Sequence, residues 1–274
     1  MTISSPLLSA EIENQPIQTG VDGAGGAAPS RQSPADVGYS IRPGKVAGAL
    51  IVVVLGLVLA STFARLAVSY VGPDRYRGLM EFALRFDLDH EINIPTWYSS
   101  CTLLCCAVLL AAITVARKQA GCRYAVHWGL LALAFLFLSV DETANLHEIL
   151  IVPLRRRLGA QGLLYFAWVI PGAVLVGAFA LAYVRFLLEL DKRTRYLFLA
   201  AGAAYVGGAL GMEMVGGACA DWYGLESMRY LAAMTVEESL EMLGIVIFLY
   251  ALFDYIRRQT GQWRIGFSPP RREG

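Results

Sequence analysis

The chain has 274 residues, of which 56% are hydrophobic and only 16% charged, and its mean hydropathy is +0.51. This composition excludes an ordinary soluble domain and indicates membrane-spanning helices. The net charge of +1 gives no indication of nucleic-acid binding, and the five cysteines, which contain no CxxC pair, do not form the pattern of a disulfide framework.

The two ends of the chain differ from its apolar centre. Residues 1–43 are rich in Ser, Pro, Gly, Gln and Ala and lack apolar periodicity, which predicts a disordered cytoplasmic tail. Residues 258–274 are expected to form a basic cytoplasmic tail. Residues 44–257, between these tails, are expected to form one transmembrane domain.

Six long apolar segments within this domain predict six membrane-spanning helices. Residues 71–91 mix charged residues with apolar residues at roughly helical spacing, which predicts a short helix on the membrane surface. The expected fold is therefore an all-α, polytopic membrane protein. The predicted spans are 46–64, 92–116, a segment from Tyr124 to Val140 that runs into the acidic stretch, 158–184, a segment from Tyr196 to Glu213, and 230–253.

The distribution of basic residues predicts the orientation of these helices. The two tails and the loops around 117–123 and 185–195 carry 15 of the 23 Lys and Arg residues, and the loops on the other side carry eight. Because basic residues favour the cytoplasmic side, both termini are expected there. The other side holds Arg155, Arg156 and Arg157, which are candidates for binding a lipid headgroup, with interfacial anchoring or salt bridges to nearby acids as equal alternatives.

The third span ends in an abruptly polar sequence, SVDETANLHE at residues 139–148. If the helix continues, Asp141, Asn145 and Glu148 lie on one stripe of it, at positions i, i+4 and i+7. The alternative is a helix that emerges into water, with these side chains solvated.

Acidic residues also lie within the sixth span. Only 12 uncharged residues separate Glu241 from Asp254. Such a segment covers about 18 Å, whereas the hydrocarbon core of a bilayer needs about 30 Å. Glu241 is therefore expected to lie inside the membrane, together with Glu237, which shares its helix face.

Several carboxylates at this depth require a bound cation, a shared proton or pairing with Arg. Oxygen-rich ligands with one His suit Mg, Mn, Ca or iron better than a structural zinc site, and the candidate cofactor is a divalent metal, with Fe, Mn, Mg and Zn considered. Glu237 and Glu142 are the candidates for acid–base catalysis. The predicted metal ligands are Asp141, His147, Glu148, Glu213, Glu238 and Glu241.

Three segments resemble recurring segments of an uncharacterised group of bacterial multi-pass membrane proteins. They are EINIPTWYSS at 91–100, SVDETANLHE at 139–148 and YVGGALGME at 205–213. The resemblance covers most of residues 90–250. It implies a multi-pass protein of the bacterial inner membrane, and it implies no activity.

Three functions remain open from the sequence. The first is a metal-dependent membrane enzyme that acts on a lipid or small amphiphile, in which the metal activates water or oxygen. The second is a cation- or proton-coupled transporter that uses the same acids, although the chain contains no evident internal repeat. The third is a non-catalytic subunit or assembly factor whose polar face docks a partner. Membrane lipids are the expected surroundings in each case.

Overall fold

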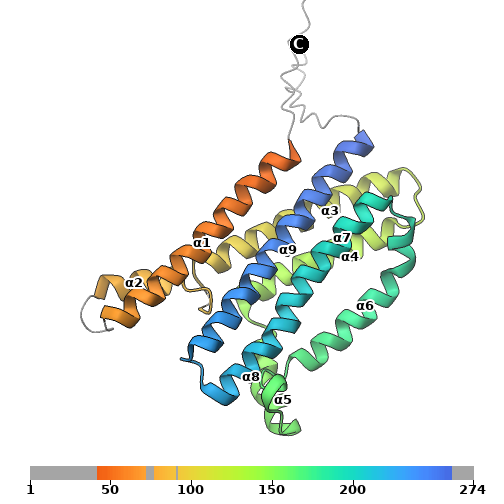
Figure 1. Cartoon of the computed structure of the whole chain (residues 1–274). Helices are drawn as coiled ribbons and strands as arrows, with labels where there is room; N and C mark the ends of the chain where they lie inside the picture. Colours follow the sequence, from red (N-terminus) through yellow and green to blue (C-terminus); the bar gives the residue numbers. More distant parts are fainter. Residues whose placement is uncertain (1–41, 72–76, 91, 261–274) are drawn as a thin grey trace, which may run out of the picture. The chain divides into compact units, whose positions relative to one another are not determined.

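The computed structural model describes residues 42–71, 77–90 and 92–260, which fold into helices and turns without a strand (Figure 1). The tails expected at 1–43 and 258–274 lie outside these residues, apart from 42–43 and 258–260. The helices are α1 (Pro43–Val71), α2 (Arg77–Phe86), α3 (Ile94–Gln119), α4 (Ala125–Ala144), the 3₁₀ turn η1 (Glu148–Leu150), α5 (Ile151–Leu158), the 3₁₀ turn η2 (Gly162–Leu164), α6 (Val169–Glu189), α7 (Lys192–Val206), the π-helical segment η3 (Gly207–Met212), α8 (Glu213–Tyr223) and α9 (Met228–Thr260).

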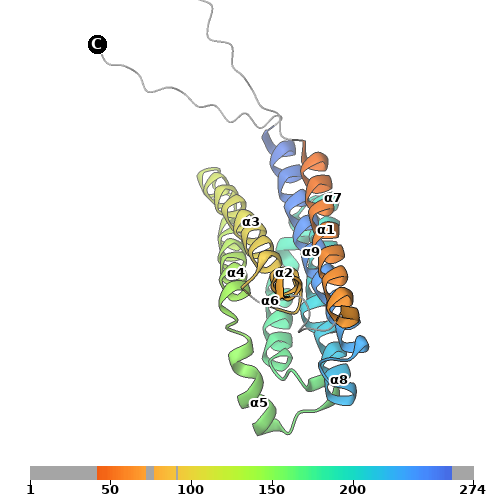
Figure 2. The same cartoon turned by 90° about the vertical axis from the view of Figure 1, so that its left-hand side faces the viewer.

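Six helical segments of the described chain are long and apolar enough to cross a membrane. They are α1, α3, α4, α6, the continuous segment α7–η3–α8, and α9. This result confirms the expected all-α fold with six spans. The start of α1 and the end of α9 lie at the same end of the helix bundle in both views (Figures 1 and 2). Assignment of that end to the cytoplasm stays a prediction.

The predicted boundaries differ most from the structure in the fourth and fifth spans. The fourth begins at Val169 rather than residue 158, because Gly159 adopts a left-handed conformation (φ 60°) and ends α5. The fifth continues beyond Glu213 to Tyr223, where Gly224 (φ 86°) ends α8. The residues of α8 after Glu213 are therefore helical, and its small residues Gly216, Gly217, Ala218 and Ala220 are buried.

The central helix of the fold is α9. In its most apolar window 61% of the residues are buried, against 17–39% in the other five spans. Helices α1, α3, α7 and α8 and the segment η3 all pack against it. Large apolar side chains, including Leu103, Leu110, Phe186 and Leu252, form a core where α3, α4, α6, α7 and α9 meet. This core holds the bundle together in the half that contains the termini.

The closest approach of α7 and η3 to α9 depends on two glycines. A Cβ atom on Gly244 of α9 would lie 2.7 Å from the backbone nitrogen of Tyr205 and 2.9 Å from the carbonyl oxygen of Ala201. A Cβ atom on Gly208 of η3 would lie 2.8 Å from the carbonyl oxygen of Glu237. Small residues of this kind permit close packing between membrane helices.

Asp254 joins α9 to α7 at the end of the bundle that holds the termini. Its side chain is fully buried and forms ion pairs with Arg193, Arg257 and Arg258, each at 3.0 Å. Arg258 also pairs at 2.8 Å with Asp191, the N-cap residue of α7. A buried carboxylate is tolerated where its charge is neutralised in this way, so these contacts connect the two helix ends.

The contact between α7 and α9 is testable at Gly244. The substitution Gly244→Ala is expected to lower the free energy of unfolding by about 1–3 kcal/mol, because the added methyl group would overlap backbone atoms of α7. The measurement is unfolding of the detergent-purified protein by increasing SDS, followed by circular dichroism. Gly48→Ala, at an open position of α1, is the matched control and should not destabilise the protein. Equal stability of the two variants would contradict this packing.

Candidate functional site

The polar sequence after the third span forms a turn, not a continued helix. Helix α4 ends at Ala144, and Asn145 adopts the left-handed conformation (φ 50°, ψ 42°). The Asp141 carboxylate accepts the backbone N–H of His147 at 3.0 Å and lies 2.8 Å from the His147 ring nitrogen Nδ1. These contacts stabilise the turn that ends α4, and Asn tolerates the left-handed region better than most residues. The expected stripe of Asp141, Asn145 and Glu148 is therefore wrong, and Glu148 is exposed.

The surroundings of His147 favour its charged form. Burial by itself lowers the pKa of His147, but the hydrogen bond to Asp141 and the negative charges of Asp141, Glu213 and Glu148 outweigh burial. The pKa of His147 therefore lies above its ordinary value of 6.5. The ion pair contributes its full stability below pH 6.5 and loses it as the pH rises through the raised pKa.

Trp168 connects this turn to the fifth span. Its ring centroid lies 4.6 Å from that of His147, and its indole Nε1–H donates a hydrogen bond to Oε1 of Glu213 at 3.0 Å. Trp168 is the N-cap residue of α6, so the loop before α6 determines its position. The aromatic residue was not predicted as part of a site, because its polar partners come from distant parts of the chain.

Glu213 and Glu237 bring carboxyl groups from two spans into contact. Glu213 begins α8, Glu237 belongs to α9, and their side chains lie within hydrogen-bonding reach. Gly216 of α8 borders this contact, since a Cβ atom there would lie 3.8 Å from Oε2 of Glu237, an ordinary van der Waals distance. No ion pair between described residues joins either carboxyl group to Lys or Arg. Such a pair is stabilised by a shared proton or a bound cation.

The π-helical segment η3 lies directly before Glu213. A π-helix holds more residues in each turn than an α-helix, so it changes the direction of the side chains that follow. A Cβ atom on Gly208 would come within 2.8 Å of Cγ of Glu241, which shows how closely η3 lies on the acidic turn of α9. Departures of this kind from α-helical geometry are frequent at functional sites.

Further acids lie within electrostatic range of this pair. Glu241 interacts with the charges of Asp141, Glu142, Glu213 and Glu238, which come from α4, α8 and α9. The hydroxyl group of Tyr205 in α7 interacts with several of the same acids. All of these acids are partly buried. The structure therefore brings most of the predicted acidic site residues into one region of the bundle.

These residues do not form a metal site in the part of the chain that the structure describes. No group of three or more His, Cys, Asp or Glu side chains in these ranges could hold a metal ion. The His147 ring is engaged by Asp141 and Trp168, and Glu213 is engaged by Trp168 and Glu237. The predicted metal ligation by Asp141, His147, Glu148, Glu213, Glu238 and Glu241 therefore has no support from this geometry.

A second set of polar contacts lies beside the carboxyl pair and was also not predicted. The hydroxyl group of Tyr230 donates a hydrogen bond to Asp89 at 2.7 Å, and Asp89 pairs with Arg65 at 3.4 Å. The Tyr230 hydroxyl also interacts electrostatically with Glu213 and Glu237. These contacts link the loop after α2 to the acidic end of α9.

The basic residues Arg155, Arg156 and Arg157 occupy the last turn of α5. The guanidinium group of Arg155 lies over the ring of Tyr165, 4.3 Å from its centroid, and Arg156 and Arg157 are exposed. Binding of a lipid headgroup by these residues stays a prediction.

The Asp141–His147 contact leads to a prediction about titration. The substitution Asp141→Asn is expected to lower the pKa of His147, because it removes a negative charge and leaves the imidazole partly buried. NMR of the histidine side chains across a pH series measures this, and the chain contains only three His residues. His147→Gln identifies the resonance, and Glu226→Gln at an exposed position is the control. An unchanged pKa in Asp141→Asn would rule out the coupling.

Comparisons with known proteins place the chain in a family. No curated protein and no solved structure matches it. Residues 47–256, which include all six spans except their outermost turns, match the model of a family described as a domain of unknown function (DUF8692). The chain therefore belongs to this uncharacterised family of membrane proteins.

Proposed function

We propose that the chain is a proton-coupled membrane transporter in which Glu213 and Glu237 carry the coupling proton, or a small cation in its place. The contact between these two carboxyl groups is the observation that carries the proposal. Carboxyl groups inside the membrane that contact one another, without a Lys or Arg between them, are typical of ion and proton pathways.

The geometry supports movement of a proton through this region. Trp168 donates a hydrogen bond to Glu213, and Glu237 lies within hydrogen-bonding reach of the same carboxyl group. A carboxyl pair that holds one proton can lose it only by taking up another cation or by separating. Loss or gain of the proton therefore changes the force between α8 and α9.

The fifth span has the features that such a change requires. The segment η3 is π-helical, and three of its six residues are glycine, which adopts a wider range of backbone conformations than other residues. Irregular helical backbone at membrane depth is common around the ion sites of transporters. The sequence alone indicated a regular fifth span. The π-helical segment η3 is the reason to prefer transport over the other functions.

His147 and Asp141 form a candidate entry point for protons. Both side chains are partly exposed, at 30% and 15%, and the charge of His147 interacts with that of Glu213. A histidine with a pKa above 6.5 exchanges protons with water in the physiological range. We infer that protons reach Glu213 from this side of the bundle.

The orientation proposed here follows the basic residues. The loops and tails at the end with the termini carry 15 of the 23 Lys and Arg residues, which favours the cytoplasm for that end. The carboxyl pair then lies in the extracytoplasmic half of the bilayer. The proposed location is the inner membrane of a bacterium, as the sequence resemblance implies.

The enzyme hypothesis receives less support. It assigns acid–base roles to Glu237 and Glu142 and needs a metal held by the other acids. Among the described residues no group of side chains has the arrangement of metal ligands. The hypothesis of a non-catalytic subunit has no specific contact in its favour.

The shared proton can be detected directly. The infrared spectrum of the purified protein is expected to contain a carbonyl band of a protonated carboxyl group that is lost in Glu237→Gln, because the substitution removes one member of the pair. The band should remain in Glu226→Gln, where an exposed carboxyl group is removed. Loss of the band in both variants, or in neither, would contradict a proton held by Glu213 and Glu237.

Transport itself is tested with protons as the probe. Liposomes that contain the protein and a pH-sensitive dye are given a membrane potential, and proton entry is expected to exceed that of protein-free liposomes. Entry in Glu237→Gln should fall to the protein-free level, while Glu226→Gln should match the unsubstituted chain.

Two outcomes would oppose transport. Proton entry unaffected by Glu237→Gln would remove the proposed role of the pair. Stoichiometric metal in the purified protein, lost in Glu238→Gln/Glu241→Gln, would favour the metal-dependent enzyme in its place.

A further inference from the structure

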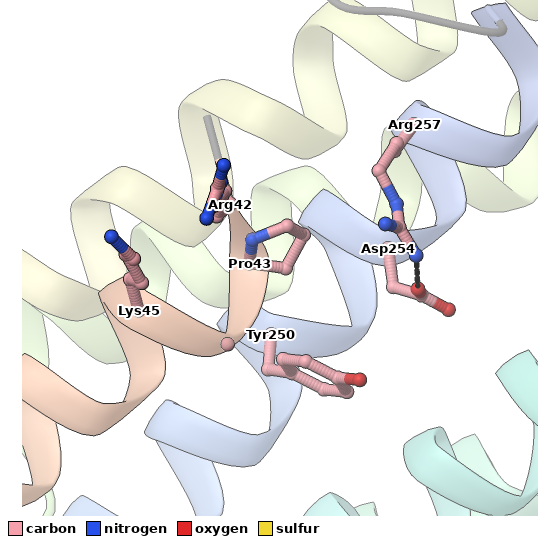
Figure 3. A pocket seen from close by; sticks show the side chains of 7 residues that line it. Arg42, Pro43, Lys45, Tyr250, Asp254 and Arg257 are labelled. Carbon is pink, nitrogen blue, oxygen red and sulfur yellow. Dashed lines mark hydrogen bonds and ion pairs between the residues drawn. The ribbon is translucent and has the colours of Figure 1, made fainter. Parts of the chain in front are cut away.

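We propose that the end of the bundle that holds the termini contains a binding site for a phosphate group of an anionic lipid. The site is a pocket of about 550 Å³ between the start of α1 and the last turns of α9. Arg42 and Lys45 line it from α1, and Tyr250, Asp254 and Arg257 line it from α9 (Figure 3). The site lies at the other end of the spans from Arg155–Arg157 and is independent of the transport proposal.

The charge of the pocket favours an anion. Three of its lining side chains, Arg42, Lys45 and Arg257, are cationic, and only Asp254 is anionic. Arg193 and Arg258, which do not line the pocket, each form an ion pair with Asp254 at 3.0 Å. These two arginines already neutralise the negative charge of Asp254. The positive charge of Arg42, Lys45 and Arg257 is therefore not needed to balance Asp254, and a phosphate group can pair with these side chains.

Two polar groups of the pocket, those of Arg257 and Tyr250, are held in place by neighbouring residues. Asp254 is fully buried and fixes the guanidinium group of Arg257 at 3.0 Å (Figure 3). The Tyr250 hydroxyl accepts a hydrogen bond from Nη2 of Arg193 at 2.8 Å, so its own hydrogen remains able to donate to a phosphate oxygen. Groups fixed in advance lose less conformational entropy when a ligand binds.

The surface next to the pocket matches a lipid better than a free phosphate. Val52, Leu55 and Leu59 lie on the same face of α1 as Lys45 and are 69%, 56% and 68% exposed. An acyl chain can run along this apolar face while the phosphate group occupies the basic pocket above it. Basic pockets at helix ends bind anionic lipid headgroups in this manner.

The test compares lipid binding by the full-length protein and its variants. Native mass spectrometry measures the apparent dissociation constant of phosphatidylglycerol, with phosphatidylcholine as the neutral-headgroup comparison. Arg42→Gln/Lys45→Gln is expected to weaken phosphatidylglycerol binding roughly 30-fold, since each basic residue near an anionic headgroup contributes about a factor of five. Both residues are exposed, so the variant should fold normally.

Two further variants separate local contacts from general charge. Lys118→Gln/Arg123→Gln removes the same charge from exposed positions in the last turn of α3 and the loop that follows it, and should bind phosphatidylglycerol like the unsubstituted chain. Lys45→Arg keeps the charge in the pocket and should also retain binding. An equal loss in Lys118→Gln/Arg123→Gln, no loss in Arg42→Gln/Lys45→Gln, or equal binding of the two lipids would overturn the lipid site.

A second arm distinguishes the source of the phosphate group. Calorimetry with inorganic pyrophosphate measures binding of a soluble phosphate compound to the same proteins. Weak or absent binding of pyrophosphate beside tight binding of phosphatidylglycerol supports a lipid ligand. Tight pyrophosphate binding that is lost in Arg42→Gln/Lys45→Gln, without selective lipid binding, would overturn the lipid ligand in favour of a soluble phosphate.

Discussion

The close contact of α9 with the fifth span is the constraint on which the rest of the structure depends. Gly244 and Gly208 allow the backbones of the two spans to meet at distances that a side chain would prevent. Together with the packing of α1 and α3, this contact makes α9 the most buried of the six described spans. It also brings Glu237 against Glu213, so the packing that stabilises the fold and the arrangement of the candidate site have the same physical origin.

Buried carboxyl groups have different partners at the two ends of the bundle. At the end with the termini, Asp254 is surrounded by three arginines, and its charge is neutralised within the protein. In the acidic region, Glu213 and Glu237 have each other and Trp168 as contacts. A neutralised carboxylate serves the fold, whereas a carboxyl pair without arginine responds to protons or cations from outside.

Sequence patterns were sufficient for the number and type of spans, because an apolar segment long enough to cross a bilayer has few alternatives to a helix. They were not sufficient for the turn after α4, since its conformation depends on the particular hydrogen bonds that Asp141 makes with His147. Trp168 was missed for a related reason. Its role comes from contacts with residues 21 and 45 positions away, which no local pattern records.

The position of α9 after the fifth span has a consequence for biosynthesis. This helix carries Glu237, Glu238, Glu241 and Asp254, and acidic residues oppose the entry of an isolated helix into lipid, by about 2.5–3.5 kcal/mol for an Asp at the bilayer centre. The surfaces that accommodate these residues belong to α7, η3 and α8, which the ribosome completes first. We therefore expect α9 to enter the membrane as a partner of the fifth span and not as an independent segment.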